Sequence, residues 1–139
     1  MFFKRVFLFM FGRKKTNPKK ILIVEDDSLL LKVLSAAFLA EKFEVMTVEN
    51  GLEATEMVEK FSPDIILLDL IIPGIDGFAV LKQLKENSDT KKIPVAVISN
   101  LGTPGDIKST KALGADEYFI KANTEIEKIV SYVKSKLKV

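Results

Sequence analysis

Short apolar runs alternate with amphipathic segments along the chain from residue 20 onward. Apolar runs of strand length lie at residues 21–24, 65–68, 94–98 and 118–120, and residues 44–48 alternate between polar and apolar as a strand does. Apolar residues at helical spacing predict helices over residues 28–41, 52–58, 78–84, 107–113 and 124–137. Ser62 and Pro63 are expected to end the second helix, and Gly114 the fourth. Thr124 is predicted to cap the last helix, with Glu127 as its capping-box partner.

This alternation predicts an α/β domain in which a parallel sheet carries helices on both faces. Residues 65–68 are apolar throughout, as expected for a strand that is covered on both sides. Five strands within about 120 residues fit the flavodoxin-like (βα)5 fold, with strand order 2-1-3-4-5. In that order the first and third strands are neighbours, so we expect the functional site at their carboxyl edge.

Polar side chains follow four of the five predicted strands. They are Glu25 and Asp26 after the first, Asp69 after the third, Ser99 after the fourth and Lys121 after the fifth. Because the carboxyl ends of parallel strands meet at one edge, these side chains should converge. Several carboxylates in one small pocket need a cation to balance them, which argues for a bound metal. Asp27 is interpreted instead as a helix N-cap, and Asp64 and Asp76 as turn or cap residues.

Composition narrows the kind of metal and excludes several kinds of enzyme. The 139 residues suit one domain with its own core, and they include neither Cys nor His. This excludes disulfides, thiolate or imidazole metal sites and a histidine general base. A metal must therefore be held by oxygen, which favours Mg²⁺, Mn²⁺ or Ca²⁺ over Zn²⁺.

Residues 1–19 are interpreted as an apolar and basic extension that precedes a domain at residues 20–139. Residues 2–11 are mostly apolar, but this run is shorter than the roughly 20 residues that cross a bilayer. No small-residue cleavage site of a signal peptide follows it. Two interpretations stay open: the extension is disordered, or residues 2–15 make a peripheral membrane contact.

The net charge of +2 conceals an uneven distribution. The first 20 residues contain seven of the 21 basic side chains and none of the 19 acidic ones. The rest of the chain therefore carries 14 basic and 19 acidic side chains, a net charge of −5. A mildly acidic domain is not a nucleic-acid footprint, so no direct nucleic-acid partner is expected.

Four segments, in this order, resemble the receiver domain of two-component response regulators over residues 20–139. They are Ile21-Leu-Ile-Val-Glu25-Asp26-Asp27, Asp64-Ile-Ile-Leu-Leu-Asp69-Leu-Ile-Ile-Pro73-Gly74-Ile-Asp76-Gly77, Val97-Ile-Ser99 and Gly114-Ala-Asp-Glu-Tyr118-Phe-Ile-Lys121. The resemblance implies that Asp69 is the phosphoacceptor. The phosphoryl group would come from a phosphohistidine on a sensor histidine kinase or phosphotransfer protein, with Mg²⁺ or Mn²⁺ as cofactor.

The resemblance also assigns roles to the surrounding residues. The metal ligands would be Asp26 directly, Glu25 through water, Asp69 itself and the backbone carbonyl of Ile71. Lys121 would pair with Asp69 and then with a phosphoryl oxygen, while the Ser99 hydroxyl binds another phosphoryl oxygen. Tyr118 would change rotamer when Ser99 moves.

Four residues around these positions raise questions specific to this chain. Asn100 stands where the family usually has a small residue, so it would either crowd the phosphate or donate to it. Ala122 replaces a frequent Pro after Lys121, which would set that loop differently. Ile71 and Leu101 place apolar side chains beside the acceptor, and we hypothesise that they hinder water and slow loss of the phosphoryl group.

The resemblance implies a cytoplasmic, stand-alone receiver that signals by protein contacts and is not an enzyme in the ordinary sense. Its unknown downstream protein would bind the face formed by residues 107–113, 118–120 and 124–137. The alternative is a pseudo-receiver that is not phosphorylated and acts as a binding module. A phosphatase of the haloacid dehalogenase kind is disfavoured, because it expects a second Asp where this chain has Ile71.

Overall fold

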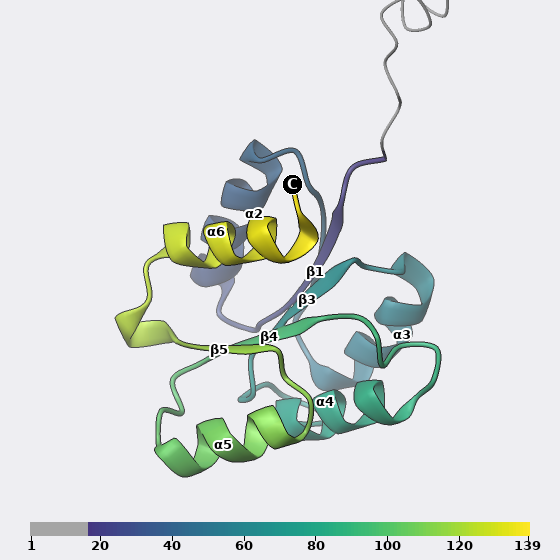
Figure 1. The fold of residues 1–139 in the computed structure, drawn as a ribbon, viewed down its shortest axis with the longest axis vertical. Coiled ribbons are helices and arrows are strands. Elements are labelled where there is room, and N and C mark those ends of the chain that lie inside the picture. Colours follow the sequence, from purple (N-terminus) through teal and green to yellow (C-terminus); the bar gives the residue numbers. More distant parts are fainter. Residues whose placement is uncertain (1–16) are drawn as a thin grey trace, which may run out of the picture.

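The computed structural model describes residues 17–139, in which strands and helices alternate as the sequence predicts (Figure 1). The elements are β1 (Lys20–Val24), α2 (Ser28–Ala40), β2 (Glu44–Val48), α3 (Gly51–Phe61), β3 (Ile65–Leu68), α4 (Gly77–Glu86), β4 (Val95–Ser99), α5 (Pro104–Ala112), β5 (Glu117–Ile120), the 3-10 turn η1 (Lys121–Asn123) and α6 (Ile126–Leu137). The parallel strands lie in the order β2-β1-β3-β4-β5, which confirms the predicted flavodoxin-like topology.

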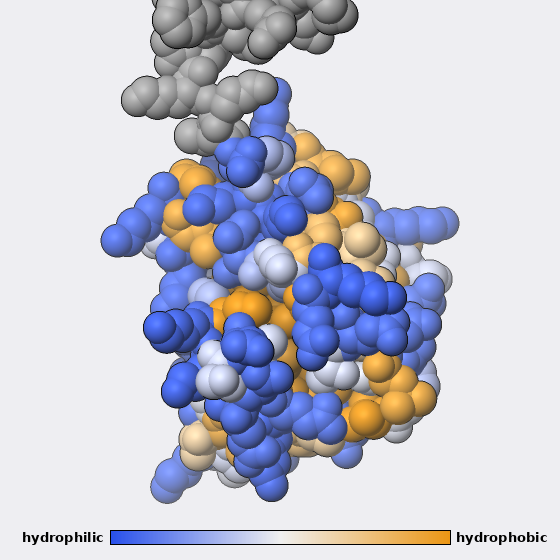
Figure 2. Space-filling view, turned by 90° about the vertical axis from the view of Figure 1, so that its right-hand side faces the viewer, coloured by the Kyte–Doolittle hydropathy of each residue, from blue (hydrophilic) through white to orange (hydrophobic). Residues whose placement is uncertain are grey.

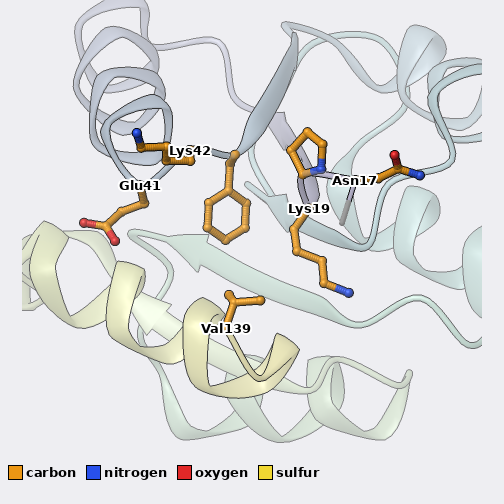
Figure 3. Close-up of a pocket in the computed structure, with 7 residues that line it drawn as sticks. Asn17, Lys19, Glu41, Lys42 and Val139 are labelled. Atoms are coloured by element: carbon orange, nitrogen blue, oxygen red, sulfur yellow. The ribbon is translucent and has the colours of Figure 1, made fainter. Parts of the chain in front are cut away.

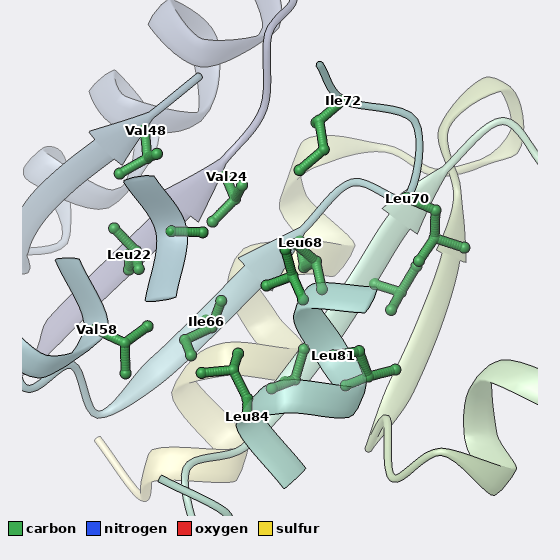
Figure 4. Packing of buried hydrophobic residues seen from close by; sticks show 14 of the residues in the cluster. Leu22, Val24, Val48, Val58, Ile66, Leu68, Leu70, Ile72, Leu81 and Leu84 are labelled. Atoms are coloured by element: carbon green, nitrogen blue, oxygen red, sulfur yellow. The ribbon is translucent and has the colours of Figure 1, made fainter. Parts of the chain in front are cut away.

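Two apolar cores lie on the two faces of the sheet, because alternate residues of a strand point to opposite sides. In β1, Ile21 and Ile23 belong to the core under α2 and α6, whereas Leu22 and Val24 belong to the core under α3 and α4. Figure 1 shows α2 and α6 on one side of the sheet and α3, α4 and α5 on the other. Figure 4 shows the second core, where side chains of β1 and β3 pack against those of α3 and α4.

The main differences from the predicted elements lie at helix starts. α3 begins at Gly51, one residue before the predicted start, and the Asn50 side chain caps it by accepting from the Glu53 N–H at 2.9 Å. The predicted cap at Thr124 is wrong, because α6 begins at Ile126 with Glu125 as its N-cap. The Thr124 hydroxyl instead donates to the Ile120 carbonyl at 2.8 Å, across the unpredicted turn η1.

The surface that Figure 2 shows is mostly hydrophilic, with apolar side chains exposed between the hydrophilic ones. Among residues 17–139, no helix combines the length and apolar character that crossing a membrane needs. The predictions for the extension concern residues 1–19, and residues 1–16 lie outside the described range. The division into extension and domain therefore stays a prediction.

Candidate functional site

Three carboxylates meet at the carboxyl edge of β1 and β3. One oxygen from each of Glu25, Asp26 and Asp69 lies within 4.8 Å of the others. Adjacent strands place them there: the Asp69 N–H donates to the Val24 carbonyl at 3.0 Å, and the Glu25 N–H to the Val48 carbonyl at 2.9 Å. Glu25 and Asp69 are only 2% and 4% exposed, whereas Asp26 is open to solvent.

The Lys121 ammonium bridges the two buried carboxylates. Its Nζ lies 2.7 Å from Asp69 Oδ2 and 2.7 Å from Glu25 Oε1. Burial opposes the charge of Lys121, but its hydrogen bonds to Asp69 and Glu25 outweigh burial and raise the pKa of Lys121. Burial raises the pKa of Glu25, and the hydrogen bond from Lys121 only partly opposes this effect. The site therefore concentrates negative charge beside one fixed cation.

The hydrogen bonds of the acids distinguish their roles. Glu25 accepts from Lys121 at one oxygen and from the Asp27 N–H at the other, at 3.0 Å. Asp27 points elsewhere: its Oδ1 accepts from the N–H groups of Leu29 and Leu30, which confirms it as the N-cap of α2. Asp26 thus remains the exposed acid of the cluster.

A tight turn after β3 fixes the backbone that follows Asp69. Gly74 adopts φ +84°, a conformation that side chains rarely tolerate. The Gly77 N–H donates to the Leu70 carbonyl at 2.9 Å, and a Cβ on Gly77 would lie 2.4 Å from the Asp69 carbonyl oxygen. Asp76 caps α4 by accepting from the Ala79 N–H, as the sequence predicts.

Ser99 and Lys121 are brought together by the register of the last two strands, because Ser99 pairs with Ile120, the residue before Lys121. Ser99 is fully buried, and its Oγ accepts from the Leu101 N–H at 3.2 Å. Asn100 follows it at the surface. The structure thus places the predicted phosphate-binding hydroxyl at the end of β4, on the same edge as the acids.

Two further predicted residues lie at the rim. The Ile71 N–H donates to Asp69 Oδ1 at 3.2 Å, while its side chain is 58% exposed. The Tyr118 hydroxyl donates to the Leu101 carbonyl. Burial raises the pKa of Tyr118, and its hydrogen bond with Ser99 lowers it in part. The Tyr118 side chain therefore contacts the loop that follows β4.

The donor set fits a hard divalent cation. Carboxylate oxygens are the ligands that Mg²⁺ and Mn²⁺ prefer, and Mg²⁺ keeps several waters rather than a full protein cage. Asp26, which is open to solvent, fits direct ligation. Glu25 and Asp69 are buried, and each already accepts hydrogen bonds at both oxygens. The acidic cluster can therefore hold a divalent metal.

Sequence reasoning missed some contacts that shape the site. The Gly51 N–H donates to the Pro73 carbonyl at 2.9 Å, so the start of α3 supports the loop that follows Asp69. The Leu101 N–H donates to Ser99 Oγ, and the Leu101 carbonyl accepts from the Tyr118 hydroxyl. Backbone contacts of this kind leave no signature in side-chain types, although the Asn50-Gly51 pair was a usable sign of a helix start.

The fold and the acidic edge define a five-stranded parallel α/β domain with an oxygen-lined site where β1 and β3 end. The model of the response regulator receiver domain matches residues 21–134, and the chain belongs to this family. It is a receiver domain of two-component signalling, and the resemblance stated from the sequence is confirmed.

Curated relatives and solved structures agree with this assignment. The polar-differentiation response regulator DivK of Brucella anthropi is 31% identical over 86% of this chain and 97% of its own length. The response regulator PleD of Caulobacter vibrioides is 39% identical over 73% of this chain, which spans only 22% of PleD. The Mn²⁺-bound form of response regulator Rcp1 is 29% identical, covers 85% of this chain and 93% of its own, and has a TM-score of 0.75.

Proposed function

We propose that Asp69 accepts a phosphoryl group from the phosphohistidine of a sensor histidine kinase or phosphotransfer protein. The observation that carries this proposal is the position of the Lys121 ammonium, 2.7 Å from Asp69 Oδ2 beside the acidic cluster. A carboxylate is a nucleophile at neutral pH without a base, so a chain that lacks His can perform this transfer. The activity of a receiver requires little more than positioning and compensation of charge.

In the transfer, an Asp69 carboxylate oxygen bonds to phosphorus while the bond from phosphorus to the histidine nitrogen breaks. The imidazole leaves with the electron pair. Lys121 compensates one phosphoryl oxygen, and the Ser99 hydroxyl donates to another after turning from the Leu101 N–H. Mg²⁺, when bound by Asp26, Asp69 and the Ile71 carbonyl, neutralises charge on the phosphoryl oxygens.

Phosphorylation would then alter the contacts that the domain makes with other proteins. The receiver acts as a stand-alone, cytoplasmic signalling protein whose downstream partner binds the face formed by α5, β5 and α6. Tyr118 on β5 connects this face to the site, because its hydroxyl contacts the loop that follows Ser99. Its rotamer would change when Ser99 engages the phosphoryl group. Residues 2–15 of the extension either are disordered or add a peripheral membrane contact.

The test is incubation with acetyl phosphate and Mg²⁺, with phosphorylation followed on phosphate-binding gels. We expect modification of the wild-type chain, loss of modification on chelation of Mg²⁺, and none in Asp69→Asn, which preserves shape but removes the nucleophilic carboxylate. Asp76→Asn is the matched control, because Asp76 caps α4 and should leave the transfer intact. Modification that survives Asp69→Asn, or an unmodified wild-type chain, would favour the pseudo-receiver.

A further inference from the structure

The connection between β2 and α3 (residues 48–51) contacts both loops that carry the acids of the cluster. At its first residue, the Val48 carbonyl accepts from the Glu25 N–H at 2.9 Å, just after β1. At its last residue, the Gly51 N–H donates to the Pro73 carbonyl at 2.9 Å, in the loop after β3. This short connection therefore joins the loop after β1 to the loop after β3.

Gly51 packs so closely against the loop after β3 that a side chain has no room. A Cβ on Gly51 would lie 1.7 Å from the Ile75 carbonyl oxygen and 2.7 Å from the Ile75 carbonyl carbon, far inside van der Waals contact. Among the described glycines, those with positive φ are Gly74 and Gly114, so space rather than backbone conformation requires glycine at residue 51. On the loop side, a Cβ on Gly74 would lie 3.3 Å from Leu52 Cγ. The start of α3 and the loop after β3 are thus tightly interlocked.

A hollow of about 510 Å³ beside this contact shows which segments meet there. Its lining comes from the loop after β1, the β2–α3 connection, the start of α3 and the loop after β3: Asp26, Glu49, Asn50, Leu52, Glu53, Pro73 and Gly74. The pocket of about 540 Å³ in Figure 3 lies instead around Lys19, Lys42 and Val139, and none of the residues that line the hollow belongs to it. The exposed acid of the cluster and the loop after β3 therefore meet at the β2–α3 connection.

We propose that Gly51 is a positioning residue for the metal and makes the site select Mg²⁺ over Ca²⁺. By holding the loop after β3 against the β2–α3 connection, Gly51 sets the spacing between the ligands on the two loops. Asp26 lies on one loop, and Asp69 and the Ile71 carbonyl lie on the other. The inference rests on the proposed binding of a divalent metal by these groups, but it does not depend on phosphorylation of Asp69.

The two ions differ in how much they depend on that spacing. Mg²⁺ requires near-ideal octahedral geometry with ligands at about 2.0–2.1 Å, whereas Ca²⁺ accepts about six to eight oxygens at about 2.3–2.6 Å in flexible arrangements. A shift of the loop after β3 therefore weakens the binding of Mg²⁺ more than that of Ca²⁺. A change that only lowers the stability of the fold has no reason to distinguish the two ions.

The first experiment compares Gly51→Ala with wild type and with Val58→Ala. Val58 is a buried residue about two turns further along α3, so its truncation destabilises the same helix without adding an atom beside the loop. The Kd for Mn²⁺ is measured for each protein from the electron paramagnetic resonance signal of free Mn²⁺. Competition against Mn²⁺ then gives the Kd values for Mg²⁺ and for Ca²⁺ without any phosphorylation step.

We expect Gly51→Ala to raise the Kd for Mg²⁺ by about tenfold or more, as the loss of groups that orient metal ligands does, and the Kd for Ca²⁺ by about twofold. Val58→Ala should leave the ratio of the two Kd values as in wild type. An unchanged ratio in Gly51→Ala, or an equal change in Val58→Ala, would overturn the role of Gly51 and leave the metal site standing. A wild-type chain that binds none of the three ions would overturn the metal site and this proposal together.

A second variant tests the same spacing without adding bulk, so the test does not depend on the folding of Gly51→Ala. Asn50→Gly loosens the β2–α3 connection, because glycine gives the backbone more freedom, and glycine is itself accepted at a helix N-cap. The Kd for Mg²⁺ should rise about threefold relative to that for Ca²⁺, since the spacing is less firmly held. A ratio of Kd values equal to that of wild type in Asn50→Gly would contradict the proposal.

Discussion

The Lys121 ammonium is shared by two buried carboxylates, and this sharing sets the charge of the site. Glu25, Asp26 and Asp69 carry three negative charges when ionised, and Lys121 balances one of them. The remaining two charges match a divalent cation. Burial raises the pKa of Glu25, which is the expected response of a carboxyl group in a crowded acidic pocket. Metal-free protein should therefore contain unrelieved repulsion between its acids.

Asp26→Asn is expected to stabilise the metal-free protein and to abolish the stabilisation that Mg²⁺ gives. Asp26 is the exposed acid of the cluster, so its loss relieves repulsion without leaving a buried group unpaired. In wild type, Mg²⁺ at a hundredfold excess over its Kd should add about 2.7 kcal/mol to the free energy of unfolding. Urea denaturation with Mg²⁺ or with chelator measures both effects. Glu49→Gln, a nearby exposed acid outside the cluster, should respond to Mg²⁺ as wild type does.

Replacing Ile71 by Asn should speed loss of the phosphoryl group. The Ile71 side chain is exposed, and its N–H donates to Asp69, so we expect the side chain to hinder an attacking water, whereas an amide would hold one by hydrogen bonds. Decay of radiolabelled phosphoprotein at saturating Mg²⁺ gives the rate, and an acceleration of about tenfold corresponds to 1.4 kcal/mol of barrier. Leu39→Asn removes an equally exposed apolar side chain near the end of α2, away from the turn after Asp69, and should leave the rate unchanged. A wild-type phosphoprotein that decays within seconds would contradict this expectation.

At the scale of elements, the sequence predicts strands better than helix starts, and the reason is physical. The apolar run of β3 must be buried on both faces, so burial fixes its place. A helix start depends instead on which polar atom reaches which N–H, and several candidates lie close together in the sequence. Asp27 and Asp76 become N-caps. Thr124 does not, because its hydroxyl donates to the Ile120 carbonyl instead.

Candidate site residues are predictable for the same reason that strands are. Each lies at the carboxyl end of a strand, so the order of strands places Asp69, Ser99 and Lys121 at one edge. The backbone contacts that hold the acceptor turn are not predictable in this way. They depend on distances across the loop, such as the approach of Gly77 to the Asp69 carbonyl.

Gly77→Ala is therefore expected to destabilise the domain and to impair the acceptor. The added Cβ would lie 2.4 Å from the Asp69 carbonyl oxygen, so the turn must shift at a cost of about 1–3 kcal/mol. Phosphorylation by acetyl phosphate should slow as well, since the Asp69 backbone moves. Gly105→Ala in α5 is the matched control, because its Cβ would make only an ordinary contact with Thr103 Oγ1 at 3.9 Å and Ala favours helix by about 0.5–1 kcal/mol. Urea denaturation should show a lower free energy of unfolding for Gly77→Ala and a higher one for Gly105→Ala than for wild type.

At the scale of the whole molecule, an aromatic contact helps to hold α6 on the sheet. At the core under α2 and α6, the rings of Phe119 on β5 and Tyr132 on α6 pack edge to face, with 5.6 Å between their centroids. Burial raises the pKa of Tyr132 to about 12, and the charges of Asp116 and Glu117 contribute. The neutral phenol is thus part of the way α6 is held on the sheet.

Alkaline pH should consequently weaken the fold through Tyr132. The pKa of this phenol is about 12 in the folded state and near 10 when exposed, so the folded protein retains its proton over that interval. Stability is fully present below pH 10 and is lost as pH rises toward 12. Tyr132→Phe removes this loss, so the fall in the free energy of unfolding between pH 8 and pH 11 should be smaller than in wild type. Lysines titrate in both proteins and cancel in the comparison, and an identical fall in the two would show that Tyr132 is not linked to folding.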